Sequence, residues 1–494
     1  MSTIGIFDWT IFFFYLIVVF CVGVYFTRRQ KTREDYFVGG RKMNWIAVGI
    51  SLFATSFSSI SFLAYPREGA FEDYHLFLTL LCIPFVIVPL LWFVFVPMYI
   101  RLGVTSIYEY LERRFSRRMR RLGTLLFAGY AIGWMGSMLY GMGLILQAVL
   151  GLSEPQMMLM LVGIGMFAML YTMLGGVQAV IWNDVLQTII LGGGMLAVFF
   201  LACGMIDGGF GTVVRFGMEN DKFNMFDVEF DIVERRNVYS AIAFALFMYL
   251  PGYTVSQTTA QRYVCMSSLG EARRSLLISG VVSTLVCLLF FVVGTTMFTF
   301  YNRPGIGGFP ELFRQDQLLP HFVVSEIGVT GLTGLLLAGL FAAALSTIDS
   351  GINSMTAVVV YDWLSEKDPG VGMSRALTCV FGVLVIAAAL IAPYIGQHLI
   401  EIISKITGVF LGLLLGVFLL GMFSSTANPG GTFIGLIAGT IALAVVGTQT
   451  ILPHWWYGGI TIAVTVIVGL AASRFFARPD ENKLNMLLSR ILAG

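Results

Sequence analysis

The 494-residue sequence contains little charge and no clustered cysteine. Asp, Glu, Lys and Arg make up 12% of it, against about 25% in an average soluble domain. The six cysteines are scattered, without a CxxC motif or a Cys/His cluster, so neither a disulfide framework nor a zinc site is indicated. The net charge is only +2, which offers no basic face to nucleic acid. These shortages exclude the disulfide-stapled, zinc-binding and nucleic-acid-binding classes.

Apolar residues are what the sequence has in excess. They make up 57% of the chain, the mean hydropathy is +0.85, and they form runs long enough to cross a bilayer, about 20 residues each. The first run, 9–26, lacks the basic start of a signal peptide, which favours a membrane helix. We predict an all-α polytopic membrane protein. Its thirteen predicted transmembrane segments lie near residues 7–27, 45–65, 75–100, 122–150, 157–175, 184–206, 238–260, 275–300, 330–361, 375–395, 398–423, 431–449 and 456–475.

The distribution of basic residues predicts the orientation. If every segment spans, the loops on one side hold twenty-two Lys and Arg residues, and the loops on the other side hold seven. Loops rich in Lys and Arg stay in the cytoplasm. The N-terminus is therefore predicted to lie outside and the C-terminus in the cytoplasm, in a plasma membrane such as the inner membrane of a bacterium.

Two of the predicted spans are interrupted. The second, 45–66, has a serine-rich centre, and the seventh, 240–262, carries Pro251-Gly252 in its middle. Proline removes an amide donor and clashes with the preceding turn. Broken backbone at membrane depth survives only where it is packed in protein or lines a cavity.

The positions of the two interruptions predict the domain organisation. With the first span set aside, they are the first and sixth of the series, which is typical of a transporter site between two inverted halves. We predict a single transmembrane transporter domain over 1–494. Its parts are a peripheral first helix at 7–27, a first five-helix repeat at 45–206, a second inverted repeat at 238–423 and two peripheral helices at 431–475.

The segment ALSTIDSGINS, 344–354, places a carboxylate and several hydroxyls inside an apolar span. Residues three, four and seven apart share a helix face, so the polar side chains form one stripe, flanked by Asp349, that faces the bundle. An ionised Asp there needs a proton, a basic partner or a cation, and is functional by default. Lys405 is the only cation predicted within a span, and Glu401 is its likelier partner. Together with Asp184 in another span, these oxygens suit a hard cation such as sodium, and a proton on Asp349 fits the sequence equally.

Five segments resemble the sodium/solute symporter family, which includes sodium–glucose, sodium–iodide, vitamin and bacterial sialic acid transporters. The resemblance covers nearly the whole chain, and the segments that carry it are SLFATSFSSISF (51–62), FVPMYIRLGVTSIYEYLERRF (95–115), LYTMLGGVQAVIWNDVLQ (170–187), SQTTAQRY (256–263) and ALSTIDSGINSMTAV (344–358). The resemblance implies a LeuT-type inverted-repeat core of ten helices with extra helices, and sodium-driven uptake by alternating access. It implies a transporter and not an enzyme, with no cofactor apart from sodium as the coupling ion. The expected partners are a small-molecule solute, sodium ions and the lipid bilayer, and the expected state is a monomer or weak oligomer.

The resemblance also implies two ion sites. In the main sodium site, the carbonyls of Ala54 and Phe57 would face the carbonyl of Ala343 and the hydroxyls of Ser346 and Thr347. Some members of the family hold a second sodium nearer the cytoplasm. The matching positions in this chain are Asp184, Ser346, Asp349 and Ser350. The family often has a hydroxyl at position 349, so the aspartate is a departure that either strengthens cation binding or carries a proton.

The solute pocket is expected between the two broken helices and their neighbours. The predicted substrate-binding residues are Ser56, Ser58, Ser61, Trp134, Tyr253, Ser256, Gln257 and Ser404. Their hydroxyl, amide and aromatic groups suit a neutral sugar or sugar derivative, which is the predicted solute. The segment FATSFSSISF is most similar to the sialic acid branch, in which a solute-binding arginine would align near Trp134, and tryptophan cannot pair with an anion. The alternative is a small organic anion such as sialic acid or another carboxylate, coupled to sodium or to protons.

Three other functions fit parts of the sequence. An intramembrane aspartyl protease needs two buried acids, which Asp184 and Asp349 supply, but the GxGD context is missing. A channel or passive facilitator would move solute without an ion gradient. A proton-coupled symporter is the nearest competitor, and sodium titration of solute binding at fixed pH separates it from a sodium symporter.

Overall fold

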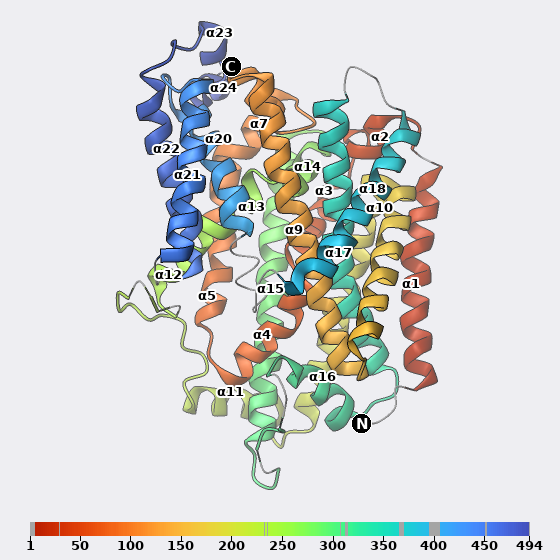
Figure 1. Ribbon diagram of the computed structural model, residues 1–494. Coiled ribbons are helices and arrows are strands. Elements are labelled where there is room, and N and C mark those ends of the chain that lie inside the picture. The colour runs from red at the N-terminus through yellow and green to blue at the C-terminus, as the bar shows by residue number, and fades with distance from the viewer. Residues whose placement is uncertain are drawn as a thin grey trace.

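The computed structural model describes residues 5–28, 30–231, 233–234, 236–306, 308–311, 315–364, 370–394, 406–449 and 452–493 (Figure 1). Every regular element within these residues is helical. The helices that build the membrane bundle are α1 (Ile6–Thr27), α3 (Trp45–Ser56), α4 (Ser59–Phe71), α5 (His75–Cys82), α6 (Val88–Leu90), α7 (Val96–Leu102), α9 (Arg117–Leu150), α10 (Glu154–Gly204), α12 (Val238–Phe244), α13 (Leu250–Thr254), α14 (Gln257–Val264), α15 (Leu269–Tyr301), α17 (Leu332–Trp363), α18 (Val371–Ile391), α20 (Leu413–Phe423), α21 (Pro429–Gln449) and α22 (Tyr457–Ser473). Shorter helices in the connections are α2 (Arg33–Val38), α8 (Glu109–Arg114), α11 (Gly209–Glu219), α16 (Leu318–His321), α23 (Glu481–Leu484) and α24 (Leu488–Ala493).

The long helix α10 folds back on itself at Gly176. This residue has a φ of 53° and a ψ of −161°, a combination that glycine adopts and other residues avoid. A Cβ there would meet the carbonyl oxygen of Tyr36 at 2.6 Å. Tyr171, before the bend, hydrogen-bonds to Asp349, and Asp184, after the bend, interacts electrostatically with the same carboxylate. The two halves of α10 are therefore two membrane passes.

The described residues contain the number of crossings that the sequence predicts. Nine helices are long and apolar enough to span a bilayer, and two pairs of bent helices make one span each. The second half of α10 adds another pass, and the shorter apolar helix Gly408–Phe423 adds one more. These passes match the thirteen predicted segments, except that residues 398–405 of the predicted segment 398–423 lie outside the described residues.

Both spans that the sequence predicts to be interrupted contain a break. α3 meets α4 at an angle of 74° across Phe57-Ser58, and α13 meets α14 at 54° across Val255-Ser256. The serine-rich centre therefore marks the first break correctly, but Pro251-Gly252 does not mark the second. Pro251 follows a π-helical turn, Ala245–Tyr249, which accommodates the missing amide donor within a continuous helix.

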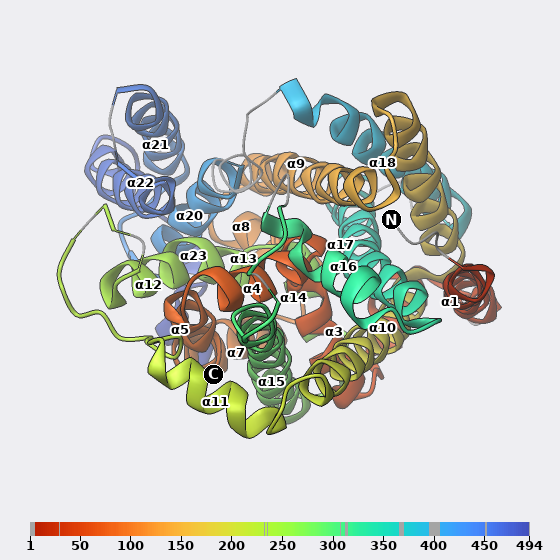
Figure 2. The same cartoon turned by 90° about the horizontal axis from the view of Figure 1, so that it is seen from below.

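The ends of the bundle are called here the N-side, where α1 begins, and the C-side, where α22 ends (Figure 1). Viewed from the N-side, α4, α14 and α17 occupy the interior, and α1, α21 and α22 lie at the rim (Figure 2). Almost every residue of α17 is buried. Its polar segment 344–354 therefore faces protein and not lipid, as the helical spacing predicts.

Although α1 lies at the rim, it is firmly attached to α17. The Asp8 carboxylate accepts hydrogen bonds from the backbone N–H groups of Gly331 and Gly334, at 3.0 and 2.9 Å. A carboxylate at a helix N-terminus is favoured by the helix dipole. A Cβ on Gly334 would lie 2.2 Å from the Asp8 carbonyl oxygen, so a glycine is needed for this close approach. The rim helix thus fixes the start of the helix that carries the polar segment.

Candidate ion and solute site

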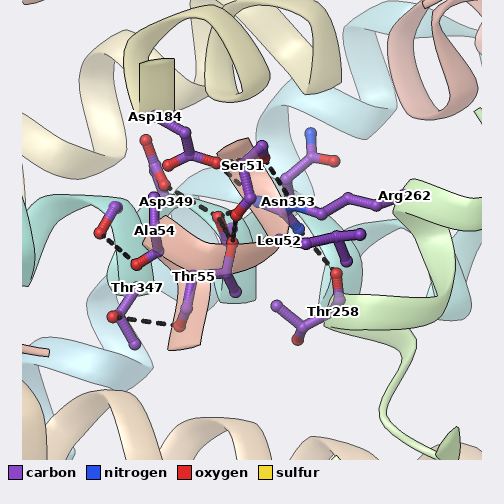
Figure 3. A network of polar contacts seen from close by, with 12 residues as sticks. Ser51, Leu52, Ala54, Thr55, Asp184, Thr258, Arg262, Thr347, Asp349 and Asn353 are labelled. Atoms are coloured by element: carbon purple, nitrogen blue, oxygen red, sulfur yellow. Dashed lines mark hydrogen bonds and ion pairs between the residues drawn. The ribbon is translucent and has the colours of Figure 1, made fainter. Parts of the chain in front are cut away.

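The first polar cluster lies where the end of α3 faces α17. The Ser346 hydroxyl donates to the carbonyl of Ala54 at 3.0 Å and lies 3.2 Å from that of Ala343. The Thr347 hydroxyl lies 3.4 Å from the Ala343 carbonyl and 3.5 Å from the carbonyl of Thr55 (Figure 3). Four of the five residues predicted for the main sodium site are therefore in mutual contact.

The fifth residue, Phe57, lies in the break itself. Its backbone is extended, with φ −94° and ψ 113°, and it ends α3. The last carbonyls of a helix have no partner within that helix, so the turn before Phe57 presents oxygens that can bind a cation. Neutral carbonyl and hydroxyl oxygens are hard ligands of the kind that alkali ions take.

The second polar cluster surrounds Asp184 in the second half of α10. Asp184 Oδ2 accepts hydrogen bonds from Ser51 Oγ at 2.5 Å and from Arg262 Nη2 at 2.8 Å (Figure 3). Arg262 also donates to Ser350 Oγ at 2.6 Å and to Ser51 Oγ at 2.7 Å. Asp184 Oδ1 has no hydrogen-bond partner among the described residues. The cluster is thus a buried ion pair with one spare carboxylate oxygen.

The position of Arg262 corrects the sequence prediction. The sequence places it in a cytoplasmic loop and leaves Lys405 as the only cation within a span. In the structure α14 continues to Val264, and Arg262 is only 2% exposed. The loops on the C-side therefore have one basic residue fewer than predicted. They still hold more Lys and Arg residues than the loops on the N-side. Lys405 and Glu401 lie outside the described residues.

Asp349 brings a second carboxylate to this cluster. Tyr171 Oη donates to Asp349 Oδ2 at 2.7 Å, and Ser350 Oγ lies 3.3 Å from Oδ1. Asp349 and Asp184 are both fully buried and interact electrostatically. Within the described ranges, Arg262 is the one Lys or Arg side chain that contacts this network. Two carboxylates therefore face one guanidinium.

The two clusters are adjacent. Thr55 Oγ1 lies 3.4 Å from Ser350 Oγ, and this contact joins the end of α3 to the Asp184 network. Three of the residues predicted for the second ion site, Asp184, Asp349 and Ser350, belong to that network. The fourth, Ser346, is hydrogen-bonded within the first cluster instead.

A cavity of 710 Å³ extends from the N-side to the two breaks. Arg67 and Glu68 lie at its mouth, and Ser256 and Thr347 lie at its floor. Arg67 is hydrogen-bonded to Glu68 at 2.7 Å and to Gln315 at 2.8 Å. It is the only Lys or Arg in the lining formed by the described residues. Because Thr347 also belongs to the first polar cluster, a solute in the cavity would lie against that cluster.

Most of the predicted substrate residues line this cavity. They are Ser56, Ser58, Ser61, Trp134, Tyr253 and Ser256. Gln257 lies elsewhere: its amide donates to the carbonyl of Thr105 at 2.8 Å and accepts from the N–H of Ile107 at 3.0 Å. Its side chain holds a C-side loop and is not free to meet a solute. Ser404 lies outside the described residues.

The structure adds cavity residues that the sequence reasoning missed. Tyr130, Tyr249 and Thr258 all line the cavity. Tyr130 lies next to Trp134 with 5.7 Å between the ring centroids. Both rings are on α9 and four residues apart, and this spacing puts them on one helix face. The sequence signal that could have found Tyr130 is therefore the aromatic pair itself.

On the C-side, the way from the cavity is closed by packed backbone and side chains. Gln261 donates to the Phe37 carbonyl and, at 2.9 Å, to the Asn353 side chain. Tyr108 Oη donates to the Val255 carbonyl at 2.9 Å, directly at the break. The structure is therefore open toward the N-side and closed toward the C-side.

A second buried ion pair lies at the C-side end of α17. Asp362 Oδ1 accepts from Arg120 Nε at 2.7 Å, and Oδ2 accepts from Ser106 Oγ at 2.9 Å and from Thr124 Oγ1 at 2.5 Å. Arg120 is also paired with Glu112 at 2.7 Å. Each Asp362 oxygen has a partner, so this pair is a saturated structural contact.

Comparison with known proteins agrees with this geometry. The sequence profile described as the sodium:solute symporter family matches residues 36–439. The chain is 33% identical to the sodium/sialic acid symporter NanT of Aliivibrio fischeri, over 98% of this chain and 95% of the relative. It is 31% identical to the sodium/sialic acid symporter SiaT of Proteus mirabilis, over 97% of each chain. A solved Na⁺-coupled sialic acid symporter, substrate-bound and outward-open, superposes with a TM-score of 0.86 at 30% identity, over 96% of this chain and 99% of that one.

Proposed function

The chain belongs to the sodium:solute symporter family, and on this basis we propose that it imports a small hydroxylated organic acid of the sialic acid type together with sodium. The observation that carries the choice of solute is the similarity to two sialic acid symporters over almost the full length of all three chains. This choice replaces the neutral sugar that the sequence favours. Import follows if the open N-side faces outward, as the basic loops predict.

The cavity supports a hydroxylated solute. Its floor and walls carry several hydroxyls, including those of Ser56, Ser61 and Thr258, that can exchange hydrogen bonds with a polyol. Ser58 caps the start of α4, and its side chain accepts from the Ser61 N–H. Helix N-termini favour anions, so we place the solute carboxylate at the start of α4.

The main ion site is proposed at Ala54, Phe57, Ala343, Ser346 and Thr347. The contacts among four of these residues, and the extended backbone at Phe57, support this assignment. Because Thr347 lines the cavity as well, sodium there would stabilise the floor on which the solute rests. This contact couples solute binding to the ion, since each would bind better when the other is present.

A second cation site is proposed at Asp184, Asp349 and Ser350, with Ser346 at its edge. The unpartnered oxygen of Asp184 supports it, because a buried carboxylate oxygen without a donor is costly unless a cation approaches. Either sodium or a proton would satisfy the Asp184 oxygen at this site. Titration of solute binding with sodium at several fixed pH values distinguishes the two, since a proton site responds to pH at saturating sodium.

A neutral sugar is the second candidate, because Trp134 and Tyr130 present aromatic faces and only Arg67 supplies positive charge to the described lining. The test is uptake into proteoliposomes under an inward sodium gradient, with sialic acid, its uncharged methyl ester and glucose as matched solutes. We expect uptake of the acid and not of the ester. Uptake of the ester or of glucose at the same rate as the acid would favour a neutral sugar as the solute.

The variant Trp134→Arg sharpens this test. A guanidinium in the cavity forms charge-assisted bonds to a carboxylate, so we expect tighter binding of the acid and no gain for glucose. Loss of all uptake with retained sodium-induced thermal stabilisation would instead show that the ring contacts a neutral solute.

A further inference from the structure

The cavity changes character between its floor and its mouth. Helix α4 shows the change, because it runs from the first break toward the N-side (Figure 1). It lines the cavity with Ser61 near the break and with Arg67 at the mouth, and between them it presents Leu63, Ala64 and Tyr65. At 1.5 Å per residue, Ser61 and Arg67 lie about 9 Å apart along the helix axis. A layer of about this depth therefore separates the hydroxyls of the floor from the charges of the mouth.

Two further walls of this layer are apolar. One is α5 with the turn that follows it, which starts at the N-side and descends toward the breaks. The other is the part of α9 that continues past Trp134 to the N-side. The side chains that these walls present to the cavity on the N-side of Trp134 carry no N–H or O–H group, and they are called here the apolar belt: Leu76, Leu80, Ile83, Met138, Leu144 and Ile145.

The apolar belt faces the space that a solute would occupy. Leu76, Leu80 and Ile83 are four and then three residues apart, a spacing that places them on one helix face, and all three line the cavity. Apolar surface in contact with water attracts apolar groups, because covering it removes that surface from water. A solute with hydroxyls along its whole length would leave those next to the belt without hydrogen-bond partners, which is unfavourable.

We propose that the solute carries an apolar group, an acyl chain or an aryl ring, on its hydroxylated acid portion, and that the apolar belt binds this group. This inference rests on the proposed function, which places the hydroxyls and the carboxylate of the solute near the breaks. The cavity volume of 710 Å³ lies within the range of about 300–1,000 Å³ that accommodates drug-sized ligands. The site therefore has room for a substituted acid, with its polar part at the floor and its apolar part at the belt.

The experiment measures how strongly N-acyl derivatives of neuraminic acid inhibit sodium-driven uptake of labelled sialic acid by the full-length protein in proteoliposomes. The acyl groups are acetyl, glycolyl and butanoyl. Burial of one methylene group strengthens binding about fourfold, so the butanoyl derivative, which has two more methylenes than the acetyl form, should inhibit at least about tenfold more strongly. The glycolyl derivative adds only a hydroxyl and should inhibit no better than the acetyl form. The butanoyl derivative should itself be accumulated under the sodium gradient.

The variant Leu80→Asn places a polar group of similar shape in the apolar belt. It should reduce the advantage of the butanoyl derivative to less than about fourfold, because the chain would then cover an amide. Leu78→Asn is the matched control, since Leu78 is on the same helix and does not belong to the described lining. It should keep the tenfold ratio. If Leu80→Asn does not fold, Ile145→Asn makes the same test from α9.

The outcomes separate this inference from the proposed function. If all three derivatives inhibit equally and sialic acid is taken up, the belt is only a seal that closes over the solute; the inference is then wrong and the proposed function stands. If sialic acid is not taken up and no derivative binds, the proposed solute is wrong as well. A tenfold gain that persists in Leu80→Asn and Ile145→Asn would mean that the chain partitions into the bilayer, and it would overturn the inference. So would a butanoyl derivative that inhibits but is not accumulated.

Discussion

Two arginine–aspartate pairs with a buried carboxylate lie in the described part of the bundle, and they differ in what surrounds that carboxylate. Asp362 on the C-side has a donor for each oxygen, from Arg120, Ser106 and Thr124. Asp184 at membrane depth has one oxygen that no described residue contacts, and a second carboxylate lies beside it. The saturated pair can only hold helices together. The unsaturated pair has both a free ligand atom and a second carboxylate beside it, which are the properties of an ion site.

The largest effect is expected for Asp184→Asn. The variant leaves Arg262 buried without its ion-pair partner and removes the spare oxygen, a change that typically costs about 3–5 kcal/mol. Sodium-driven uptake should fall by at least about a hundredfold, which corresponds to a loss of about 2.8 kcal/mol. Uptake into proteoliposomes checks this, with equal amounts of reconstituted protein. Near-normal uptake would mean that Asp184 is as structural as Asp362.

Asp362→Asn should lower the stability of the protein without changing the sodium dependence of uptake. It removes the charge that pairs with Arg120, so the unfolding temperature should drop by a margin similar to that of Asp184→Asn. The sodium concentration for half-maximal uptake should stay within about twofold of wild type, because no free ligand atom is lost. A large shift in the sodium dependence would show that the C-side pair takes part in ion coupling.

Thr347→Ala tests the first polar cluster. The variant removes one neutral hydroxyl ligand and leaves the helix packing in place. A hydrogen bond of this kind contributes about 0.5–1.5 kcal/mol, so sodium affinity should weaken about threefold to tenfold while the unfolding temperature without sodium changes little. The measurement is sodium-dependent thermal stabilisation, and unchanged uptake at limiting sodium would contradict the assignment.

The smallest effect is expected at Lys222, a buried cation to which no described residue brings a carboxylate within hydrogen-bond distance. Its ammonium donates to the carbonyls of Ala70 and Glu72 at the end of α4, both at 2.8 Å. Burial lowers the pKa of Lys222. Wild-type stability should therefore rise slightly with pH between that lowered pKa and the ordinary value of 10.5, because the unfolded chain binds the proton more strongly.

Lys222→Met should remove this pH dependence and cost about 1 kcal/mol of stability, the typical contribution of a cation at a helix C-terminus. Chemical unfolding followed at two pH values is the measurement. A loss of sodium affinity would be unexpected, because the side chain is on the N-side and contacts neither ion cluster.

Much of the fold and part of the site follow from the sequence. The thirteen spans are predictable because each needs a long apolar run, and the first break is predictable because serines accumulate where α3 ends. The second break is not, since a π-helical turn before Pro251 absorbs the effect of the proline. That local adjustment depends on packing around Ala245–Tyr249 and has no simple sequence signal.

Two errors at the site concern α14. The predicted segment 238–260 ends before Arg262, so the guanidinium is counted with the loops, and Gln257 is assigned to the solute pocket because it lies next to the break. In the structure both lie on α14, inside the closed C-side. A polar helix of eight residues can be buried only because its donors meet Asp184, Ser350 and loop carbonyls from distant parts of the chain, and local sequence does not reveal those partners.

The fold-back at Gly176 has a consequence for biosynthesis. The two passes of α10 are joined without a loop, so the ribosome delivers them to the insertion machinery with no hydrophilic pause between them. They should enter the bilayer together, as a helical hairpin, and a side chain in place of this glycine would meet the Tyr36 carbonyl oxygen and prevent the hairpin from closing.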